Sequence, residues 1–285
     1  PSAQLNEAIS AALFRNHPYG IPVIGWMHEM AALTPDDALA FYRQWYGPDN
    51  AILVIGGDVT LEEVRPLVER YYGPLTPVGV APRDRPLEPP LITEQRITLH
   101  SVQVSEPQWS RAYLSPPTAA FAPGDIEALQ LLSEILGGGS SSRLYRALVV
   151  QQGLAVSAGA YDRADYRDYA TFHLYAAPRQ GVELADLEAA VEAEVARLLE
   201  EGVTEEELRQ AKDRMQAAAI FARDDPSTAP HLIGAALATG HTLEEVQSWP
   251  ERVEAVTAEQ VDALARRLLV DAQSVTGLLL PQEPS

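Results

Sequence analysis

The feature that most constrains the fold of this chain is a helix–turn–strand pattern that occurs twice, at residues 33–58 and at residues 256–281. Each copy opens with the pattern of a capping box. The two boxes are Thr34 with Asp37 and Thr257 with Gln260. Each copy continues through an amphipathic stretch about three turns long, a polar turn and an apolar run typical of a buried strand. One unit repeated near both ends predicts two similar half-barrels or sandwiches, and not a short-period solenoid.

Apolar periodicity and turn residues predict the remaining elements in the order strands, helices, hairpin, helices and strand. That order is typical of an α+β fold. Within the first copy the strand is expected at 51–55, and Ser140 or Ser141 is the expected N-cap of the helix at 140–150. The other expected elements are helices 4–15, 60–72, 126–136, 184–200, 205–223, 228–239, 243–248 and 250–254, strands 96–105 and 108–114, and the hairpin 154–161 with 169–177.

Residues 73–90 are rich in proline and poor in apolar side chains, which is typical of a linker. With 285 residues, 46% of them hydrophobic, the chain has enough apolar side chains to form the core of one or two domains. It starts at Pro1, directly in a helical pattern, so we expect a fragment of a longer protein.

The net charge of −19 argues against nucleic acid or an anionic membrane surface as a partner, because both are bound by basic surfaces. No apolar run is long enough to span a membrane. Among the basic residues only Lys212 is a lysine. An acidic, lysine-poor chain fits both life at high salt and an arginine-biased genome. The absence of cysteine excludes disulfides, thiolate metal sites and cysteine nucleophiles.

The histidines are too far apart to form any two-histidine zinc motif on a helix. His17 stands in a proline-flanked turn and is expected to be a structural hydrogen-bonding group, while His100 and His173 fall in strand patterns. The full set is His17, His28, His100, His173, His231 and His241. We therefore expect no metal site built from this chain alone.

The run Gly137-Gly138-Gly139 followed by serines resembles a phosphate-binding turn at a helix start. It lacks the lysine of a nucleotide-binding loop and follows a helix, so a hinge with an N-cap is the favoured interpretation. Clustered carboxylates, such as those of residues 205–207, stand at expected helix N-termini, where they favour the helix dipole. The residues alone therefore indicate no active site.

Three motifs in combination resemble the insulinase/pitrilysin family of zinc metallopeptidases, in its bacterial branch related to the mitochondrial processing peptidase. They are H-P-Y-G-x-P-V-I-G at 17–25, T-x-x-D-x-x-x-F-Y at 34–42 and P-x-N-A-x-L-V-x-x-G-D-V at 48–59. Residues 136–161 and 202–227 resemble the second half of the same family. The resemblance implies two related α+β halves, each a sheet packed with helices, with the first half truncated.

By this resemblance, the zinc motif H-x-x-E-H and the distal glutamate ligand belong upstream of residue 1. The family's second half also carries an arginine and, seven residues later, a tyrosine that hold substrate; these positions fall on Val149 and Val156. Neither valine can donate a side-chain hydrogen bond. We therefore expect no catalytic, substrate-binding or metal-binding residue in this chain, and zinc only in the parent protein.

The resemblance divides the chain into the remainder of the zinc-bearing half at 1–80, a linker at 81–94 and the second half at 95–285. In the two-subunit branch one chain carries zinc and the other the Arg/Tyr pair, so this chain resembles part of the zinc-bearing subunit. The implied reaction is peptide-bond hydrolysis by zinc-bound water on a peptide or unfolded protein, inside a chamber formed by two halves or two subunits. The partner would be a family subunit or a second copy, and the implied location is the periplasm.

A second interpretation is a non-catalytic scaffold or substrate-recognition subunit of the same family, in which the two valines reflect a general loss of catalytic residues. A third is an acidic α+β binding domain with an autonomous function. The upstream sequence distinguishes the first two, because an intact H-x-x-E-H would exclude the scaffold.

Overall fold

The computed structural model describes residues 1–282 and divides the chain into two compact units. The sheet unit comprises residues 1–21, 86–216 and those from 249 onward, and the helical unit comprises residues 22–85 and 217–248. Both units are therefore built from separate stretches of sequence. The division into halves by a linker at residues 81–94 stays a prediction. No helix or strand forms between residues 75 and 94.

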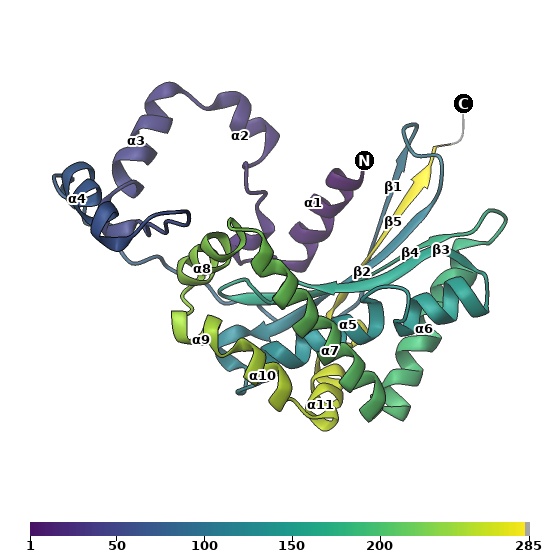
Figure 1. The fold of residues 1–285 in the computed structure, drawn as a ribbon. Helices are drawn as coiled ribbons and strands as arrows, with labels where there is room; N and C mark the ends of the chain where they lie inside the picture. The colour runs from purple at the N-terminus through teal and green to yellow at the C-terminus, as the bar shows by residue number, and fades with distance from the viewer. Residues whose placement is uncertain (283–285) are drawn as a thin grey trace. The chain divides into compact units, whose positions relative to one another are not determined.

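The sheet unit contains a mixed sheet with the strand order β1-β5-β2-β4-β3 (Figure 1). Its strands are β1 (Gln95–Ser101), β2 (Gln108–Pro117), β3 (Ala155–Asp162), β4 (Tyr169–Pro178) and β5 (Ser274–Pro281). The first and last strands pair in parallel, and the other neighbours are antiparallel. The expected hairpin and the α+β class, with helices on a mixed sheet, are confirmed.

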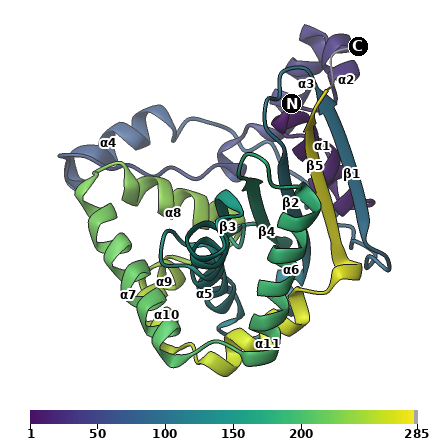
Figure 2. The ribbon, with the colours of Figure 1, turned by 90° about the vertical axis from the view of Figure 1, so that its right-hand side faces the viewer.

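Helices cover the two faces of this sheet unequally (Figures 1 and 2). One face packs against α5 (Asp125–Gly137), α6 (Leu184–Glu201) and α11 (Ala258–Leu268). The other face packs against α1 (Ser2–Leu13), which lies over β5, β1 and β2. The side chains of β4 therefore alternate between the two faces. Phe172 and Leu174 enter the large core, while Thr171 and His173 face the α1 side.

The remaining helices are α2 (Met27–Ala32), α3 (Pro35–Trp45), α4 (Leu61–Tyr71), α7 (Glu205–Phe221), α8 (Thr228–Thr239), α9 (Leu243–Gln247) and α10 (Trp249–Ala255). Short 3₁₀ turns lie at Pro18–Gly20, Pro48–Asn50, Thr118–Ala120, Ala222–Asp224 and Asp271–Gln273. None of the helices in residues 1–282 is long and apolar enough to cross a membrane.

The expected helix at 140–150 forms differently from its prediction. A π-helix spans Tyr145–Gln151, and neither Ser140 nor Ser141 caps it. The serine hydroxyl that makes a contact here is that of Ser142, which donates to the Gly139 carbonyl at 2.8 Å. The serines therefore form a closed turn after α5, and the main-chain N–H of Arg146 donates to the Ser142 carbonyl where the π-helix begins.

The two copies of the repeated pattern form the same helix start. Thr34 and Asp37 exchange the two hydrogen bonds of a capping box, and so do Thr257 and Gln260. The strands differ. In the second copy β5 lies between β1 and β2, and Val275 is fully buried.

In the first copy the expected strand at 51–55 is wrong for this structure. The stretch is irregular, and the side chain of Ile52 is 52% exposed. A strand needs a neighbour for its main-chain groups, and no strand of residues 1–282 pairs with this one. No described residue of the helical unit is buried, so this unit has no core of its own.

The last residue of α5 determines how closely that helix approaches the sheet. A Cβ on Gly137 would stand 1.6 Å from the main-chain nitrogen of Ala160 on β3. We expect Gly137→Ala to cost about 3 kcal/mol or more, because the clash is with backbone and cannot be relieved by a rotamer change. Thermal unfolding followed by circular dichroism measures the loss.

Gly234→Ala in α8 is the matched control. Its Cβ would meet only the Val54 side chain, at 3.7 Å, which is an ordinary contact. Alanine also favours a helix over glycine by about 1 kcal/mol, so no loss of stability is expected. Equal melting temperatures for both variants would contradict the close approach of α5 to β3.

Candidate functional site

The described residues contain no group of three or more histidine, aspartate or glutamate side chains arranged to hold a metal ion. His17 is not placed as a zinc ligand. Its Nδ1 accepts a hydrogen bond from the Tyr19 main chain at 3.2 Å, and its Nε2 lies 3.4 Å from Asp168. Both ring nitrogens are therefore engaged by this chain.

Glu88 fixes the same corner of the sheet unit. Its carboxylate accepts main-chain hydrogen bonds from Arg15, Asn16 and His17 at 2.7–2.8 Å. Its own main-chain N–H donates to the Tyr169 hydroxyl at 2.7 Å. The histidine and this glutamate thus close the turn after α1, which is a structural role.

The glycine-rich turn after α5 is occupied by protein groups as well. Arg143, which follows its serines, donates to both carboxylate oxygens of Glu207 at 2.7 and 2.8 Å, and to the Gly202 carbonyl at 2.7 Å. The arginine that could have met a phosphate instead joins the turn to the start of α7.

Val149 and Val156 lie where the π-helix meets β3. Val149 is partly buried against the large core, and Val156 is 51% exposed. The register between β3 and β4 shifts between Ala155 and Ser157, so Val156 lies at a β-bulge. Bulges are frequent beside binding sites because they redirect a side chain.

The strand that carries Val156 is the outermost of the sheet. β3 pairs with β4 on one side, and no strand of residues 1–282 pairs with its other side. An unpaired edge offers main-chain N–H and C=O groups to an extended peptide. The structure thus combines an open edge with two side chains that cannot hydrogen bond.

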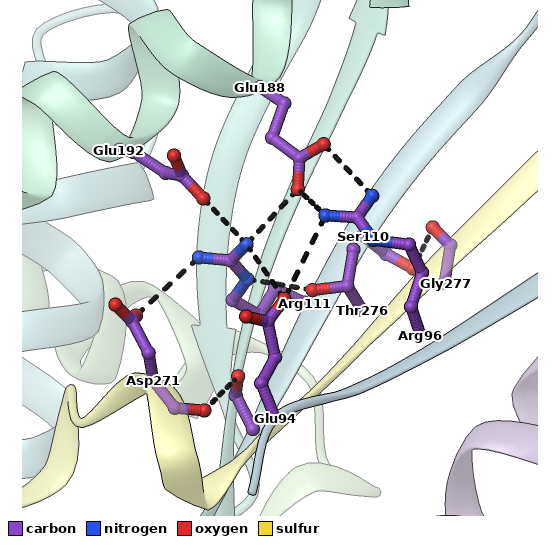
Figure 3. Close-up of polar contacts among 10 residues, drawn as sticks. Glu94, Arg96, Ser110, Arg111, Glu188, Glu192, Asp271, Thr276 and Gly277 are labelled. Atoms are coloured by element: carbon purple, nitrogen blue, oxygen red, sulfur yellow. Dashed lines mark hydrogen bonds and ion pairs between the residues drawn. The ribbon is translucent and has the colours of Figure 1, made fainter. Parts of the chain in front are cut away.

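A charged network lies on the face of the sheet that α5, α6 and α11 cover (Figure 3). Arg111 of β2 is only 3% exposed; it donates to Glu188 at 3.1 Å and Glu192 at 2.7 Å, both on α6. Its Nε donates to the Thr276 hydroxyl of β5 at 2.8 Å. Arg96 of β1 forms a two-point contact with Glu188 at 2.7 and 3.0 Å.

This network is structural. Burial acts to raise the pKa of Glu188, but the hydrogen bond and charge of Arg96 with the charge of Arg111 lower it overall. The carboxylate therefore stays ionised and paired, with no free proton-transfer role. Together the residues connect β1, β2 and β5 to α6.

The α1 side of the hairpin carries an aromatic cluster. Tyr161 of β3 stacks on His173 of β4, with ring centroids 4.6 Å apart and planes 5° apart. Tyr175 lies across Gly159, where an added Cβ would stand 2.5 Å from the tyrosine hydroxyl. The glycine therefore admits the tyrosine ring, and the three rings line one side of a pocket beneath α1.

Comparison with known proteins identifies the family. Residues 32–215 match the family model described as the peptidase M16 inactive domain. The chain therefore belongs to the M16 family of peptidases, in agreement with the resemblance of its motifs to insulinase and pitrilysin. It carries the family's non-catalytic domain.

Curated relatives are described as uncharacterized zinc proteases. One from Mycobacterium leprae is 29% identical over 273 residues, which cover 94% of this chain and 60% of the relative. One from Bacillus subtilis is 24% identical over 274 residues, which cover 95% of this chain and 64% of the relative. The chain thus spans about three-fifths of the length of these relatives.

Solved structures share the fold. A protease from Helicobacter pylori superposes with a TM-score of 0.87 at 24% identity, covering 99% of this chain and 67% of that protein. A putative M16-like peptidase from Alicyclobacillus acidocaldarius gives 0.85 at 19%, covering 99% and 66%. At these identities the likeness shows the architecture alone.

Sequence reasoning missed both the charged network around Arg111 and the aromatic cluster of the hairpin. Arg111 gave no signal, because its partners lie far away in the sequence. The Tyr161–His173 stack depends on cross-strand register, although the hairpin prediction placed both residues on facing strands. Gly159 between them was the available signal, since glycine inside a strand often marks a close approach.

Removal of the buried guanidinium tests the network. We expect Arg111→Met to destabilise the protein by about 3 kcal/mol, because it removes the buried cation that Glu188, Glu192 and Thr276 all contact. The measurement is urea unfolding at pH 7. Arg96→Met is the control: Arg96 is 44% exposed and contacts the same Glu188, so a loss of no more than about 1 kcal/mol is expected. Equal losses would contradict the dominant role of the buried arginine.

The Arg143–Glu207 contact predicts a pH dependence. Burial acts to raise the pKa of Glu207, but the bonds from Arg143 and Thr204 lower it from 4.5 to about 2. The pKa of Glu207 is lower in the folded protein than in the unfolded chain, so its ionised carboxylate stabilises the fold. This contribution is fully present above pH 4.5 and is lost as the pH falls toward 2. Glu207→Gln should therefore cost no more than about 2 kcal/mol at pH 7, and progressively less below pH 4.5.

Urea unfolding of both proteins between pH 7 and pH 3 measures this difference. Glu205→Gln, in the same first turn of α7, is the control and should show a much smaller change. A difference for Glu207→Gln that does not depend on pH would contradict the ionic origin.

Proposed function

We propose that this chain is the non-catalytic part of a zinc-dependent metalloendopeptidase subunit, and that it holds peptide substrate beside a zinc centre supplied by the rest of the parent protein. The parent reaction in this proposal is hydrolysis of a peptide bond by zinc-bound water. The chain itself neither binds catalytic zinc nor cleaves. Membership of the M16 family and the inactive-domain match support this assignment.

The open edge of β3 is the observation that carries the substrate-holding role. An extended peptide adds to such an edge through main-chain hydrogen bonds, which suits substrates of varied sequence. The bulge at Val156 sets that residue at the surface beside the edge. The proposed substrate is therefore an unstructured peptide or an unfolded protein segment.

The two valines support the involvement of a partner subunit. In our proposal a partner subunit of the same family supplies the arginine and tyrosine that Val149 and Val156 cannot replace. The peptide then lies in a chamber between two subunits. This arrangement assigns the parent of this chain the role of the zinc-bearing subunit.

A scaffold or substrate-recognition role is the alternative. The same valines fit a subunit that has lost catalysis altogether. A complex III structure from Candida albicans superposes with a TM-score of 0.83 at 14% identity, covering 99% of this chain and 67% of that one, so the same fold occurs within that complex.

The deciding experiment uses the parent protein with its natural N-terminus. We expect about one zinc per chain by elemental analysis, and cleavage of an unstructured peptide library only when a family subunit carrying the Arg/Tyr pair is added. The 285-residue chain should contain no stoichiometric zinc and should cleave nothing, alone or with that subunit. A parent protein without zinc would establish the scaffold alternative.

A gain-of-function variant tests the role of the valines. The parent protein with Val149→Arg and Val156→Tyr should cleave without the partner subunit, because it would then carry the missing hydrogen-bond donors. Val150→Arg with Val156→Tyr is the matched control, since Val150 is adjacent and 65% exposed. Equal activity of the two pairs would show that the position of the arginine does not matter.

A further inference from the structure

The pocket beneath α1 has the size of a single side chain. It has a volume of about 150 Å³ and lies between α1 and the face of β2, β3 and β4 that α5 and α6 do not cover. Cavities of about this volume in other proteins hold one benzene molecule. The pocket is therefore too small for a nucleotide or a sugar chain, and it fits one large side chain of a peptide.

The pocket lining is mixed: apolar and aromatic residues are the more numerous, and Asn6, Ser10 and Ser110 add polar groups. Ile9, Leu13 and Phe14 line it from α1 and the residue after it. The stacked rings of Tyr161 and His173 line the opposite side. Such surfaces favour an aromatic or branched aliphatic group over a polar one.

His173 contributes to this apolar character because it is neutral. Burial, and then the positive charge of Arg163, lower its pKa to about 4. Its Nε2 lies 2.9 Å from the Thr171 hydroxyl, so the ring is already held by a hydrogen bond within its own strand. Near neutral pH the imidazole therefore offers an uncharged ring face and no cation.

Arg163 is the charged residue in the pocket lining. It stands just after β3, is exposed, and donates to the Tyr166 hydroxyl at 2.7 Å. No carboxylate of residues 1–282 lies within ion-pair distance of Arg163, and the charge of Asp165, which acts to raise its pKa, acts from further away. Arg111 and Arg143, by contrast, contact carboxylates directly. A guanidinium has five N–H donors, so most of them remain available to an incoming anion.

We infer that this pocket binds the C-terminal residue of a peptide, with its apolar side chain against Tyr161 and His173 and its terminal carboxylate on Arg163. A C-terminal residue carries both groups on one Cα, which matches an apolar pocket with a cation in its lining. An internal acidic side chain would bring its charge into the apolar interior, at a desolvation cost. This inference rests on the proposed function, because it takes the ligand to be a peptide.

Such a site would hold the new C-terminus that each cleavage creates, or the natural end of a substrate. Both have the same chemistry, and peptides of different length distinguish them. A site for cleavage products would bind a pentapeptide and a twenty-residue peptide with the same last residue equally well. A site for the natural end of a substrate would favour the longer peptide, which can also occupy the β3 edge.

The test is fluorescence anisotropy with the 285-residue chain and labelled alanine-rich peptides that end in phenylalanine. The free carboxylate form should bind at least about tenfold more tightly than the C-terminal amide, as one charge-assisted contact provides. Arg163→Gln should remove this preference, and Arg163→Lys should retain part of it. Arg167→Gln, four residues further along the same loop, is the control and should leave the preference unchanged.

A second variant tests the apolar part of the pocket. Ser10→Phe places a ring in the pocket from α1 and should weaken binding of the peptide ending in phenylalanine more than that of one ending in glycine. Circular dichroism confirms that each variant is folded. Equal binding of acid and amide, or a preference that survives Arg163→Gln, would overturn this inference while peptide binding as such stands. Failure of every peptide to bind would overturn the substrate-holding role as well.

Discussion

The sheet unit depends on the position of its last strand. β5 lies between β1 and β2, so the sheet cannot be completed until the C-terminal residues join strands that precede them by more than 150 positions. Val275 and Leu279 of β5 then pack with Leu5 and Ile9 of α1 in the smaller core. On the other face Thr276 accepts the hydrogen bond of Arg111. One strand therefore joins both layers of the unit, and contacts this distant in sequence are slow to form and cooperative once formed.

The fate of the repeated pattern shows how much of the fold the sequence could predict. Local signals were sufficient for the capping boxes at Thr34 and Thr257, because a helix start is satisfied by residues within one turn. The strands required more. Residues 274–281 form a strand because two neighbours pair with it, while 51–55 has the same apolar pattern and no neighbour among the described residues. Periodicity describes which face of an element can be buried, but tertiary structure decides whether it is buried.

The candidate site was predictable only in part, for a related reason. The family resemblance singled out Val149 and Val156, and apolar periodicity predicted the strand that carries Val156, but neither showed that this strand lies at the edge of the sheet. The aromatic cluster required the register of the hairpin, in which Tyr161 faces His173 and Gly159 faces Tyr175. A shift of one residue would turn all four to the other face, and no sequence pattern fixed that register. The network of Arg111 required three elements to converge, which no local pattern encodes.

The two faces of the sheet differ in how their arginines are paired, and this difference distinguishes a structural arginine from one available to a ligand. On the helix-covered face Arg111 is buried and its charge is balanced by Glu188 and Glu192. An unpaired guanidinium there would cost several kcal/mol, and the two carboxylates remove that cost for Arg111. On the α1 side Arg163 is exposed, donates to the Tyr166 hydroxyl and has no carboxylate of residues 1–282 within ion-pair distance, while the charge of Asp165 acts on it from further away. A protein of net charge −19 has abundant carboxylates with which to pair an arginine. The place of Arg163 in the lining of an aromatic pocket, with only one of its donors engaged by the Tyr166 hydroxyl, is the physical basis for assigning it to a ligand.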